Sequence, residues 1–236
     1  MKCIETLARV NVLCVDKTGT ITENTMQVNG VVPMEDSDLI TMPELKSAIT
    51  DFVGAMSNDN ITMEAMKKYF GGPIVREAVS VTSFSSAYKY SGATFADASY
   101  VLGAPEFVLN QDYDLYREQI ENYSAEGYRV LVFGIYDGVP DGKKLTEKVT
   151  PLGLVFLSNP IRTEARETFR YFANQGVDIK VISGDNPVTV SQVALQAGIA
   201  NAQDYIDAST LHTEEEIENA VLEYTVFGRV TPDQKR

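Results

Sequence analysis

The chain has 236 residues, 44% of them hydrophobic, and a formal net charge of −13. This acidic balance argues against nucleic acid or an anionic membrane surface as a partner, because both require a basic face. One histidine, His212, and two cysteines, Cys3 and Cys14, leave little for zinc or histidine chemistry and too little for a disulfide framework. No apolar run approaches the roughly 20 residues that a membrane helix needs. We therefore expect reduced cysteines, a cytosolic compartment and two domains of unequal type.

The first predicted element is a buried parallel strand over residues 10–15, an apolar and β-branched run that stops at Asp16. A glycine-containing turn over residues 16–20 follows it. From about residue 33 the pattern changes to helices and short strands that are typical of an antiparallel sheet. The predicted helices cover 37–50, 63–70 and 113–127, and the predicted strands cover 78–84, 91–96, 99–102 and 129–136.

From residue 151 onwards, strands and helices alternate strictly. The predicted strands cover 152–157, 178–182, 205–206 and 226–230, and the predicted helices cover 163–175, 187–198 and 214–223. The simplest architecture is α/β: a doubly wound parallel sheet begun by residues 1–32, interrupted by an inserted α+β domain at 33–149, and resumed at 150–236. In such a sheet the active site lies beyond the carboxyl ends of adjacent strands, where Asp16 and residues 183–185 fall.

The turn after the first strand combines a carboxylate, small hydroxyl residues and a glycine. A carboxylate there can attack phosphorus in line when a divalent ion and fixed donors offset the charge repulsion. Gly19 lets the backbone approach a phosphate closely. The competing interpretation is an ordinary aspartate in a turn. The stretch Asp16-Lys17-Thr18-Gly19-Thr20 resembles the phosphorylation motif of the P-type ATPases, members of the haloacid dehalogenase-like superfamily.

Two later segments resemble the same family. Ser183-Gly184-Asp185 is similar to its Thr-Gly-Asp signature, and the serine hydroxyl can still donate to a phosphate oxygen. Residues 228–235 are similar to the segment whose lysine neutralises the phosphoryl group; taken alone, each segment is only a turn or a charged residue. The resemblance implies catalytic roles for Asp16, Thr18, Ser183 and Lys235, ligand contacts for Gly184 and Asp185, and Mg²⁺ bound by Asp16 and the Thr18 backbone carbonyl.

The second position after the proposed nucleophile distinguishes a pump from a phosphatase. Phosphatases of the superfamily generally carry an aspartate there, which serves as general acid and base. This chain has Thr18, which is not an efficient base at neutral pH, so we expect an acyl phosphate on Asp16 to persist. A persistent phosphoenzyme suits a pump that changes shape in that state. Two alternatives stay open: a soluble phosphatase of the same superfamily, and a module that only binds nucleotide.

The inserted domain is expected to bind ATP. Residues 84–89 resemble the family segment in which a phenylalanine, here Phe84, stacks on adenine and a lysine, here Lys89, lines the same pocket. The competing interpretation of Phe84 is a core aromatic. Residues 102–106 resemble the family's Lys-Gly-Ala-Pro-Glu with Leu102 in place of the lysine, and Gly103 still permits close approach of a ligand.

Two arginines complete the predicted nucleotide contacts. Arg129 matches an arginine near the nucleotide phosphates. Arg162 ends a turn that is similar to the family's Asp-Pro-x-Arg, with Asn159 in place of the aspartate, and it would support the nucleotide or the interface between the domains. The competing interpretation of Arg129 is a solvated charge at the start of a strand, and that of Arg162 is a surface turn.

The resemblance runs over residues 4–235 and is closest to bacterial cation-transporting ATPases linked to calcium. It implies ATP as substrate, Mg²⁺ as cofactor, and transmembrane and actuator domains of the same pump as partners. The Gly-Asp-Gly-x-Asn-Asp segment of the family would follow residue 236. We therefore expect a monomeric cytoplasmic segment of a pump in the cell membrane that carries calcium or another divalent cation.

Overall fold

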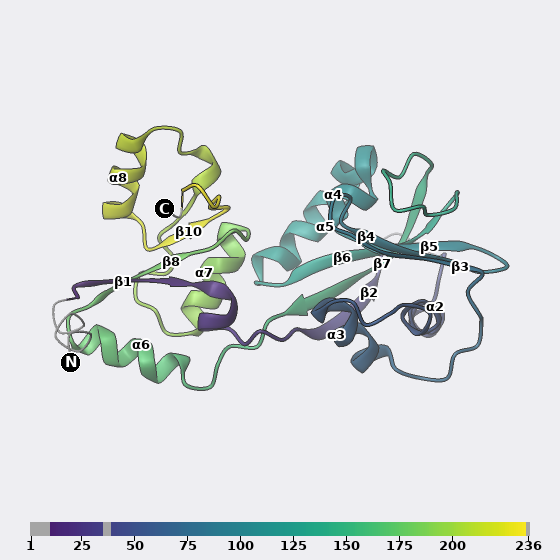
Figure 1. The fold of residues 1–236 in the computed structure, drawn as a ribbon, viewed down its shortest axis with the longest axis horizontal. Coiled ribbons are helices and arrows are strands. Elements are labelled where there is room, and N and C mark those ends of the chain that lie inside the picture. The colour runs from purple at the N-terminus through teal and green to yellow at the C-terminus, as the bar shows by residue number, and fades with distance from the viewer. Residues whose placement is uncertain (1–9, 35–38, 235–236) are drawn as a thin grey trace. The chain divides into compact units, whose positions relative to one another are not determined.

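The computed structural model describes residues 10–34 and 39–234, which fold into two compact units (Figure 1). The parallel unit contains the chain up to residue 24, residues 125–127 and residues from 159 onwards. The antiparallel unit contains residues 25–124 and 128–158. Among the described residues, no helix has both the length and the apolar character that crossing a membrane requires.

The parallel unit is built on a four-stranded sheet whose paired strands all run parallel. The order β1-β8-β10-β9 places the first strand beside one that follows it by more than 160 residues. The strands are β1 (Val12–Asp16), β8 (Asp178–Ile182), β9 (Tyr205–Asp207) and β10 (Val226–Gly228), and the helices are α6 (Ala165–Asn174), α7 (Pro187–Gln196) and α8 (Glu214–Glu223).

Both faces of this sheet are covered, because successive side chains of a strand point to opposite faces. Val181 and Val226 are fully buried in a cluster with Phe169 of α6 and with α7. Their neighbours Ile182 and Phe227 pack on the other face in a cluster that contains Ala220 of α8. These layers confirm the predicted doubly wound parallel sheet.

The antiparallel unit is a six-stranded sheet of order β2-β7-β6-β5-β4-β3, in which every pair is antiparallel. This confirms the predicted inserted domain with an antiparallel sheet. Its strands are β2 (Gln27–Pro33), β3 (Ser80–Ser85), β4 (Tyr90–Thr94), β5 (Ser99–Gly103), β6 (Arg129–Tyr136) and β7 (Val149–Ser158). Its helices are α2 (Met42–Ala55), α3 (Ile61–Phe70), α4 (Pro105–Val108) and α5 (Tyr113–Ala125).

Helices also cover both faces of this second sheet. Phe133 and Leu157 belong to one buried cluster with α2 and α3, whereas Val132 and Phe156 belong to another cluster with α4 and α5. The central strands therefore present apolar side chains on both sides. The edge strand β3 has no fully buried side chain.

The role predicted for residues 152–157 is wrong. They form a strand, but β7 pairs antiparallel with β2 and β6 instead of resuming the parallel sheet. Its run of apolar residues, buried on both faces, has the pattern of a parallel strand, and periodicity alone cannot tell the two apart. The main boundaries between the two units consequently lie at residues 24/25 and 158/159, whereas the sequence predicts boundaries at 32/33 and 149/150.

Candidate functional site

The turn that follows β1 carries the predicted nucleophile. Asp16 is the last residue of β1, and its side chain is exposed. Its Oδ1 accepts a hydrogen bond of 3.3 Å from the Thr18 amide. Gly19 has φ of +79°, a conformation that glycine adopts without strain. The turn closes where Thr22 donates its amide to the Lys17 carbonyl at 3.1 Å, and Ile21 is fully buried. The carboxylate is thus exposed at the carboxyl end of its strand on a fixed turn.

The segment 183–185 lies beside this turn. Asp16 is opposite Ile182 in the β1–β8 ladder, so the next residue, Ser183, begins beyond the same edge. The ammonium of Lys17 is almost fully buried and lies 2.5 Å from the Asp185 carboxylate, which is half exposed. The structure therefore brings together the two motifs, which are more than 160 residues apart in the sequence.

Backbone hydrogen bonds also hold Ser183 in place. Its amide donates to the Phe227 carbonyl at 2.9 Å, and its carbonyl accepts from the Val230 amide at 3.0 Å. Its side-chain oxygen accepts a longer bond of 3.3 Å from the Asp185 amide. The hydroxyl hydrogen is consequently still available to an added acceptor. Ser183 is only 2% exposed, so such an acceptor would reach it from the edge of the sheet.

Arg162 supports the turn after Asp16. Its guanidinium donates to the Gly19 carbonyl at 2.8 Å, and its amide donates to the Ile21 carbonyl at 3.0 Å. Sequence reasoning predicted a contact between Arg162 and the nucleotide. The structure places this side chain on the parallel unit's own backbone, beside the predicted phosphate site.

The segment after β10 approaches the same edge. The Arg229 amide donates to the Asp185 carbonyl at 2.7 Å, and the Arg229 guanidinium lies 2.8 Å from Asp207. Burial would raise the pKa of Asp207, but hydrogen bonds from Ser209 and the charge of Arg229 outweigh it and lower the pKa. Gln234, the last described residue, donates to the Ala208 carbonyl at 2.9 Å. Lys235, the predicted neutralising lysine, lies outside the described residues.

The oxygen atoms at this edge fit the predicted Mg²⁺. Asp16 offers an exposed carboxylate and Thr18 a backbone carbonyl, and such hard donors suit this ion. Among residues 10–34 and 39–234, no group of three or more histidine, cysteine or acidic side chains could hold a metal. Mg²⁺ commonly keeps several waters and binds one or two carboxylates together with substrate phosphates, so a sparse protein set is compatible with it.

In the antiparallel unit, Phe84 and Lys89 flank one hairpin turn. Phe84 is 40% exposed in an irregularity of the β3–β4 ladder between Thr82 and Ser85, and it is not a core aromatic. Lys89 is exposed and has φ of +54°, and its amide donates to the Ser85 carbonyl at 2.7 Å. An exposed aromatic ring and an exposed cation therefore lie on the two sides of one tight turn.

Gly103 and Arg129 lie at the same end of this sheet. Tyr90 is paired with Gly103 and Gly103 with Val132, so the start of β4, the end of β5 and the start of β6 coincide. The exposed Arg129 lies three residues before Val132. Three interstrand spacings, about 14 Å, separate β3 from β6. The register thus gathers four of the predicted nucleotide residues, Phe84, Lys89, Gly103 and Arg129, at one end of the sheet.

The close approach at Gly103 is made by the protein itself. A Cβ atom on this residue would lie 2.4 Å from the Lys89 carbonyl oxygen and 2.6 Å from Tyr90 Cβ. The next residue, Ala104, donates its amide to the same carbonyl at 2.9 Å. Leu102, which replaces the family's lysine, is buried in the cluster that faces α2 and α3. Contact of Gly103 with a ligand stays a prediction.

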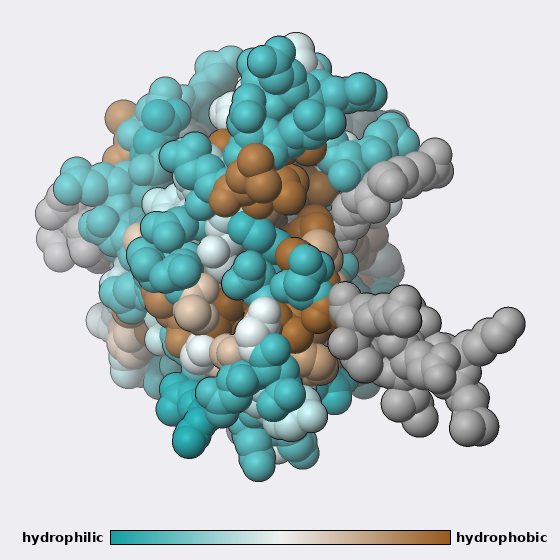
Figure 2. Space-filling view, turned by 90° about the vertical axis from the view of Figure 1, so that its left-hand side faces the viewer, coloured by the Kyte–Doolittle hydropathy of each residue, from teal (hydrophilic) through white to brown (hydrophobic). Residues whose placement is uncertain are grey.

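A cleft of about 440 Å³ opens at the opposite edge of the parallel sheet. It lies at the start of β8 and is lined by Asp178, Lys180, Asp204 and Glu223 together with the ends of α6 and α8. Figure 2 looks from the left of Figure 1 and shows mostly hydrophilic side chains with smaller hydrophobic areas between them. None of the predicted site residues lines this cleft. The cleft and the predicted phosphate site therefore lie at opposite edges of the parallel sheet.

Sequence reasoning missed the partner of Asp185. The sequence presents Lys17 only as part of the motif around Asp16, although a cation between the proposed nucleophile and Thr18 is itself a signal of local charge compensation. Its burial, 6% of the side chain exposed, depends on packing that follows only from the pairing of β1 with β8.

A protein-family model described as haloacid dehalogenase-like hydrolase matches residues 10–235. Over the whole chain, the sequence is 38% identical to "Probable cation-transporting ATPase exp7" of Streptococcus pneumoniae and to "Calcium-transporting ATPase CtpE" of Mycobacterium tuberculosis. The chain spans 30% and 29% of the length of these relatives.

Among solved structures, the fold is similar to a zinc-transporting PIB-type ATPase in its E2.Pi state, with a TM-score of 0.60 and 20% identity. The match covers 83% of this chain and 29% of that one. At this identity the likeness supports the fold, and it does so across most of the described residues.

Proposed function

Since the chain belongs to the haloacid dehalogenase-like hydrolase family, we propose that it is the ATP-binding catalytic segment of a P-type cation-transporting ATPase. The parallel unit is the phosphorylation domain and the antiparallel unit is the nucleotide-binding domain. In the whole protein this segment lies on the cytoplasmic side of the cell membrane and works with transmembrane and actuator domains. The relatives named for cation and calcium transport favour calcium or another divalent cation as cargo.

The observation that carries the proposal is the position of Asp16. Its carboxylate is exposed beyond the end of β1, on a turn whose amides and glycine leave room for a phosphate. Asp16 Oδ attacks the γ-phosphorus of ATP in line, an acyl phosphate bond forms, and ADP leaves with the electrons of the broken P–O bond.

Groups on the neighbouring strand offset the transferred charge. Ser183 donates its hydroxyl to a phosphoryl oxygen, and Lys235 supplies a positive charge from the segment after Gln234. Lys17 contributes a buried ammonium, although Asp185 already compensates much of its charge. Asp16 and the Thr18 carbonyl would hold Mg²⁺, which would supply the divalent charge that phosphoryl transfer requires.

The antiparallel unit binds the nucleotide through the end of its sheet. Phe84 offers an exposed ring for stacking on the base, and Lys89 and Arg129 offer cations for the phosphates. Gly103 holds the Lys89 backbone close to β5, so its role is to position Lys89.

Thr18 favours a pump over a phosphatase. Its amide already donates to Asp16, and its hydroxyl cannot act as an efficient base at neutral pH. Hydrolysis of the acyl phosphate is therefore slow in this segment. Rapid turnover of a small phosphomonoester such as p-nitrophenyl phosphate would contradict this argument and support a soluble phosphatase.

Acid-stable labelling by γ-³²P-ATP with Mg²⁺ tests the proposal. The wild-type chain should take up label that hydroxylamine removes, and Asp16→Asn should take up none. Asp178→Asn is the matched control, because Asp178 is the exposed first residue of the adjacent strand at the opposite edge of the sheet, and this variant should label normally. Label that persists in Asp16→Asn would exclude Asp16 as the nucleophile.

A nucleotide-binding module is the second candidate, and a specific observation favours it. The described residues contain no group of three side chains that could hold a metal. If the segment binds ATP saturably but takes up no label, it is a nucleotide-binding part that depends on further ligands from the rest of the polypeptide. If it neither labels nor binds, the assignment of Phe84 and Lys89 is wrong.

A further inference from the structure

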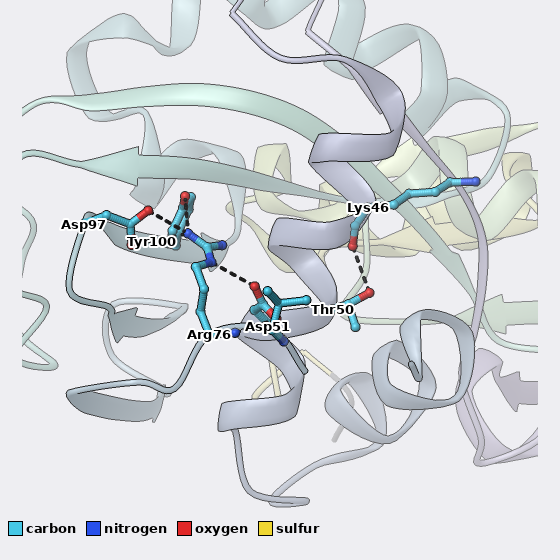
Figure 3. A network of polar contacts seen from close by, with 7 residues as sticks. Lys46, Thr50, Asp51, Arg76, Asp97 and Tyr100 are labelled. Carbon is cyan, nitrogen blue, oxygen red and sulfur yellow. Dashed lines mark hydrogen bonds and ion pairs between the residues drawn. The ribbon is translucent and has the colours of Figure 1, made fainter. Parts of the chain in front are cut away.

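A network of charged residues holds the segment that leads from α3 to β3 (Figure 3). Residues 71–79 run between these two elements without joining a strand ladder until Val79 donates to Thr94 at 2.7 Å. Asp51 and Arg76 are the centre of the network. Neither residue was singled out by the sequence.

Asp51 is a buried carboxylate that receives three donors from this segment. It lies on α2 with 2% of its side chain exposed, and its Oδ1 accepts from the amides of Val75 at 2.8 Å and Arg76 at 3.3 Å. Its Oδ2 accepts from the Arg76 Nε at 2.8 Å. Burial would raise the pKa of Asp51, but these bonds outweigh burial and lower it. Asp51 is therefore ionised and fixes both backbone and side chain of the segment.

Arg76 joins α2 to the β4–β5 hairpin. Its Nη1 lies 3.0 Å from Asp97 in the hairpin turn and donates to the Tyr100 hydroxyl of β5 at 3.1 Å. Its guanidinium also stands over the rings of Phe95 and Tyr100, at 4.9 and 5.2 Å from their centroids. One residue thus ties the start of β3 to a helix and to the strand two places away.

The strand that follows has few other features that set its register. β3 is an edge strand that pairs only with β4. None of the six residues of β3 is buried, and Val81 and Phe84 are 43% and 40% exposed, so burial does not select one face. A strand without a buried face is prone to slip, and a slip by one residue would turn Phe84 to the other face. Apart from the ladder and the hairpin turn, in which the Lys89 amide donates to the Ser85 carbonyl at 2.7 Å, a hydrogen bond from Thr82 Oγ1 to the Pro140 carbonyl holds this strand.

We infer that the Asp51–Arg76 clamp sets the register of β3, which makes Arg76 a positioning residue for the nucleotide site. The inference rests on the proposed nucleotide role of Phe84. It assigns Arg76 no contact with the ligand, because its guanidinium is engaged by Asp51, Asp97 and Tyr100. By fixing where β3 begins, the clamp selects the face on which Phe84 stands and the place of the hairpin turn that ends at Lys89.

The test removes both charges of the clamp together. Arg76→Met alone would leave a buried, uncompensated carboxylate, so loss of folding would obscure the result. The double variant Asp51→Leu/Arg76→Met removes the clamp without an unpaired charge. Arg76→Lys, which keeps the charge but not the planar fork, is the second variant. Arg117→Met is the matched control, because Arg117 also pairs with an aspartate and stands over a tyrosine ring, but on α5.

Three readouts separate positioning from stability: the melting temperature, NMR contacts between Val81 and its partner Ala93, and the affinity for ATP. We expect the double variant to melt close to the wild type, to lose the single Val81–Ala93 pairing, and to bind ATP roughly 3- to 30-fold more weakly. Arg76→Lys should show smaller changes in the same direction, and Arg117→Met none.

A double variant that keeps the Val81–Ala93 pairing and wild-type affinity for ATP would overturn the inference. If the double variant fails to fold, the Val81–Ala93 pairing and the ATP affinity of Arg76→Lys decide instead. If wild-type protein binds no ATP, the proposed function fails, and the NMR pairing alone still decides whether the clamp sets the register.

Discussion

The ion pair between Lys17 and Asp185 should respond asymmetrically to removal of its two members. Asp185→Asn leaves the ammonium of Lys17, which is only 6% exposed, without its carboxylate. With charge centres about 4 Å apart and an effective dielectric constant of about 20, the lost attraction is about 4 kcal/mol. Because Asp185 is 49% exposed, solvent screening reduces this to about 2 kcal/mol. Lys17→Met removes the buried charge itself and should cost less than about 1 kcal/mol.

Hydrogen exchange measures this difference within the parallel unit. The Val181 amide donates to the Thr225 carbonyl at 2.9 Å, and Val181 is fully buried, so its exchange reports opening of the β8–β10 pairing. A loss of about 2 kcal/mol should accelerate its exchange roughly 30-fold in Asp185→Asn. The double variant Lys17→Met/Asp185→Asn should exchange like Lys17→Met.

The control is Asp114→Asn, which breaks an exposed pair with Arg117 on α5 and should leave the Val181 amide unaffected. The reasoning is refuted if Asp185→Asn exchanges at the wild-type rate, or if Lys17→Met accelerates exchange as much as Asp185→Asn does. Either result would mean that burial of Lys17 does not depend on its carboxylate.

Gly228→Ala should destabilise the parallel unit by about 3 kcal/mol, because the new Cβ would lie 2.3 Å from Pro187 Cα, a backbone atom at the start of α7. Hydrogen exchange of the Val181 amide measures this loss of stability, and an unchanged exchange rate would contradict the predicted clash. The stability of the antiparallel unit should fall on acidification. Because the pKa of Asp51 is lowered in the folded state, its ionised carboxylate stabilises the folded unit at pH values above its ordinary pKa of 3.8. This contribution is lost as the pH falls below that value and through the lowered pKa of the folded state. Chemical denaturation between pH 6 and 3 should therefore show a smaller pH dependence in Asp51→Asn than in the wild type, and equal slopes would exclude this role.

Much of the fold follows from sequence pattern. The helix predicted at 214–223 coincides with α8, because Thr213 and Glu216 form a capping box that the sequence displays directly. The helix predicted at 37–50 is instead α2, Met42–Ala55, whose start is set by a capping box of Thr41 and Glu44. Residues 35–38 lie outside the described residues. Local capping chemistry thus predicts helix ends better than the apolar pattern does.

Strand partners follow less well from the sequence than strand positions. The run of β7 is apolar on both faces because helices cover both sides of the antiparallel sheet, and such a continuous apolar run is normally associated with a parallel sheet. Which strand a run pairs with depends on contacts far away in the chain. The pairing of β7 with β2, over 120 residues apart, gives no local signal.

The candidate site was predictable where motifs carry the chemistry and not where packing supports it. Asp16 and Ser183 could be named because strand ends and motif order place them at one edge. The motif predicts that Arg162 supports the nucleotide or the interface between the domains, which stays a prediction, but it does not reveal the hydrogen bond from Arg162 to the Gly19 carbonyl. Hydrogen bonds of this kind join segments distant in sequence, so no local pattern reveals them.

Among the residues that the structure describes, two ion pairs have a buried partner, and they perform the same physical task in the two units. Lys17 with Asp185 joins the turns that follow β1 and β8, and Asp51 with Arg76 joins α2 to the irregular segment before β3, each at a place where no ladder fixes the backbone. Hydrophobic packing there would tolerate several arrangements, whereas a buried charge strongly disfavours every arrangement that leaves it unpaired. The pairs therefore define geometry more than they add stability. Replacing either pair by apolar residues should accordingly preserve folding and lose the position of the neighbouring functional side chain, Asp16 in one unit and Phe84 in the other.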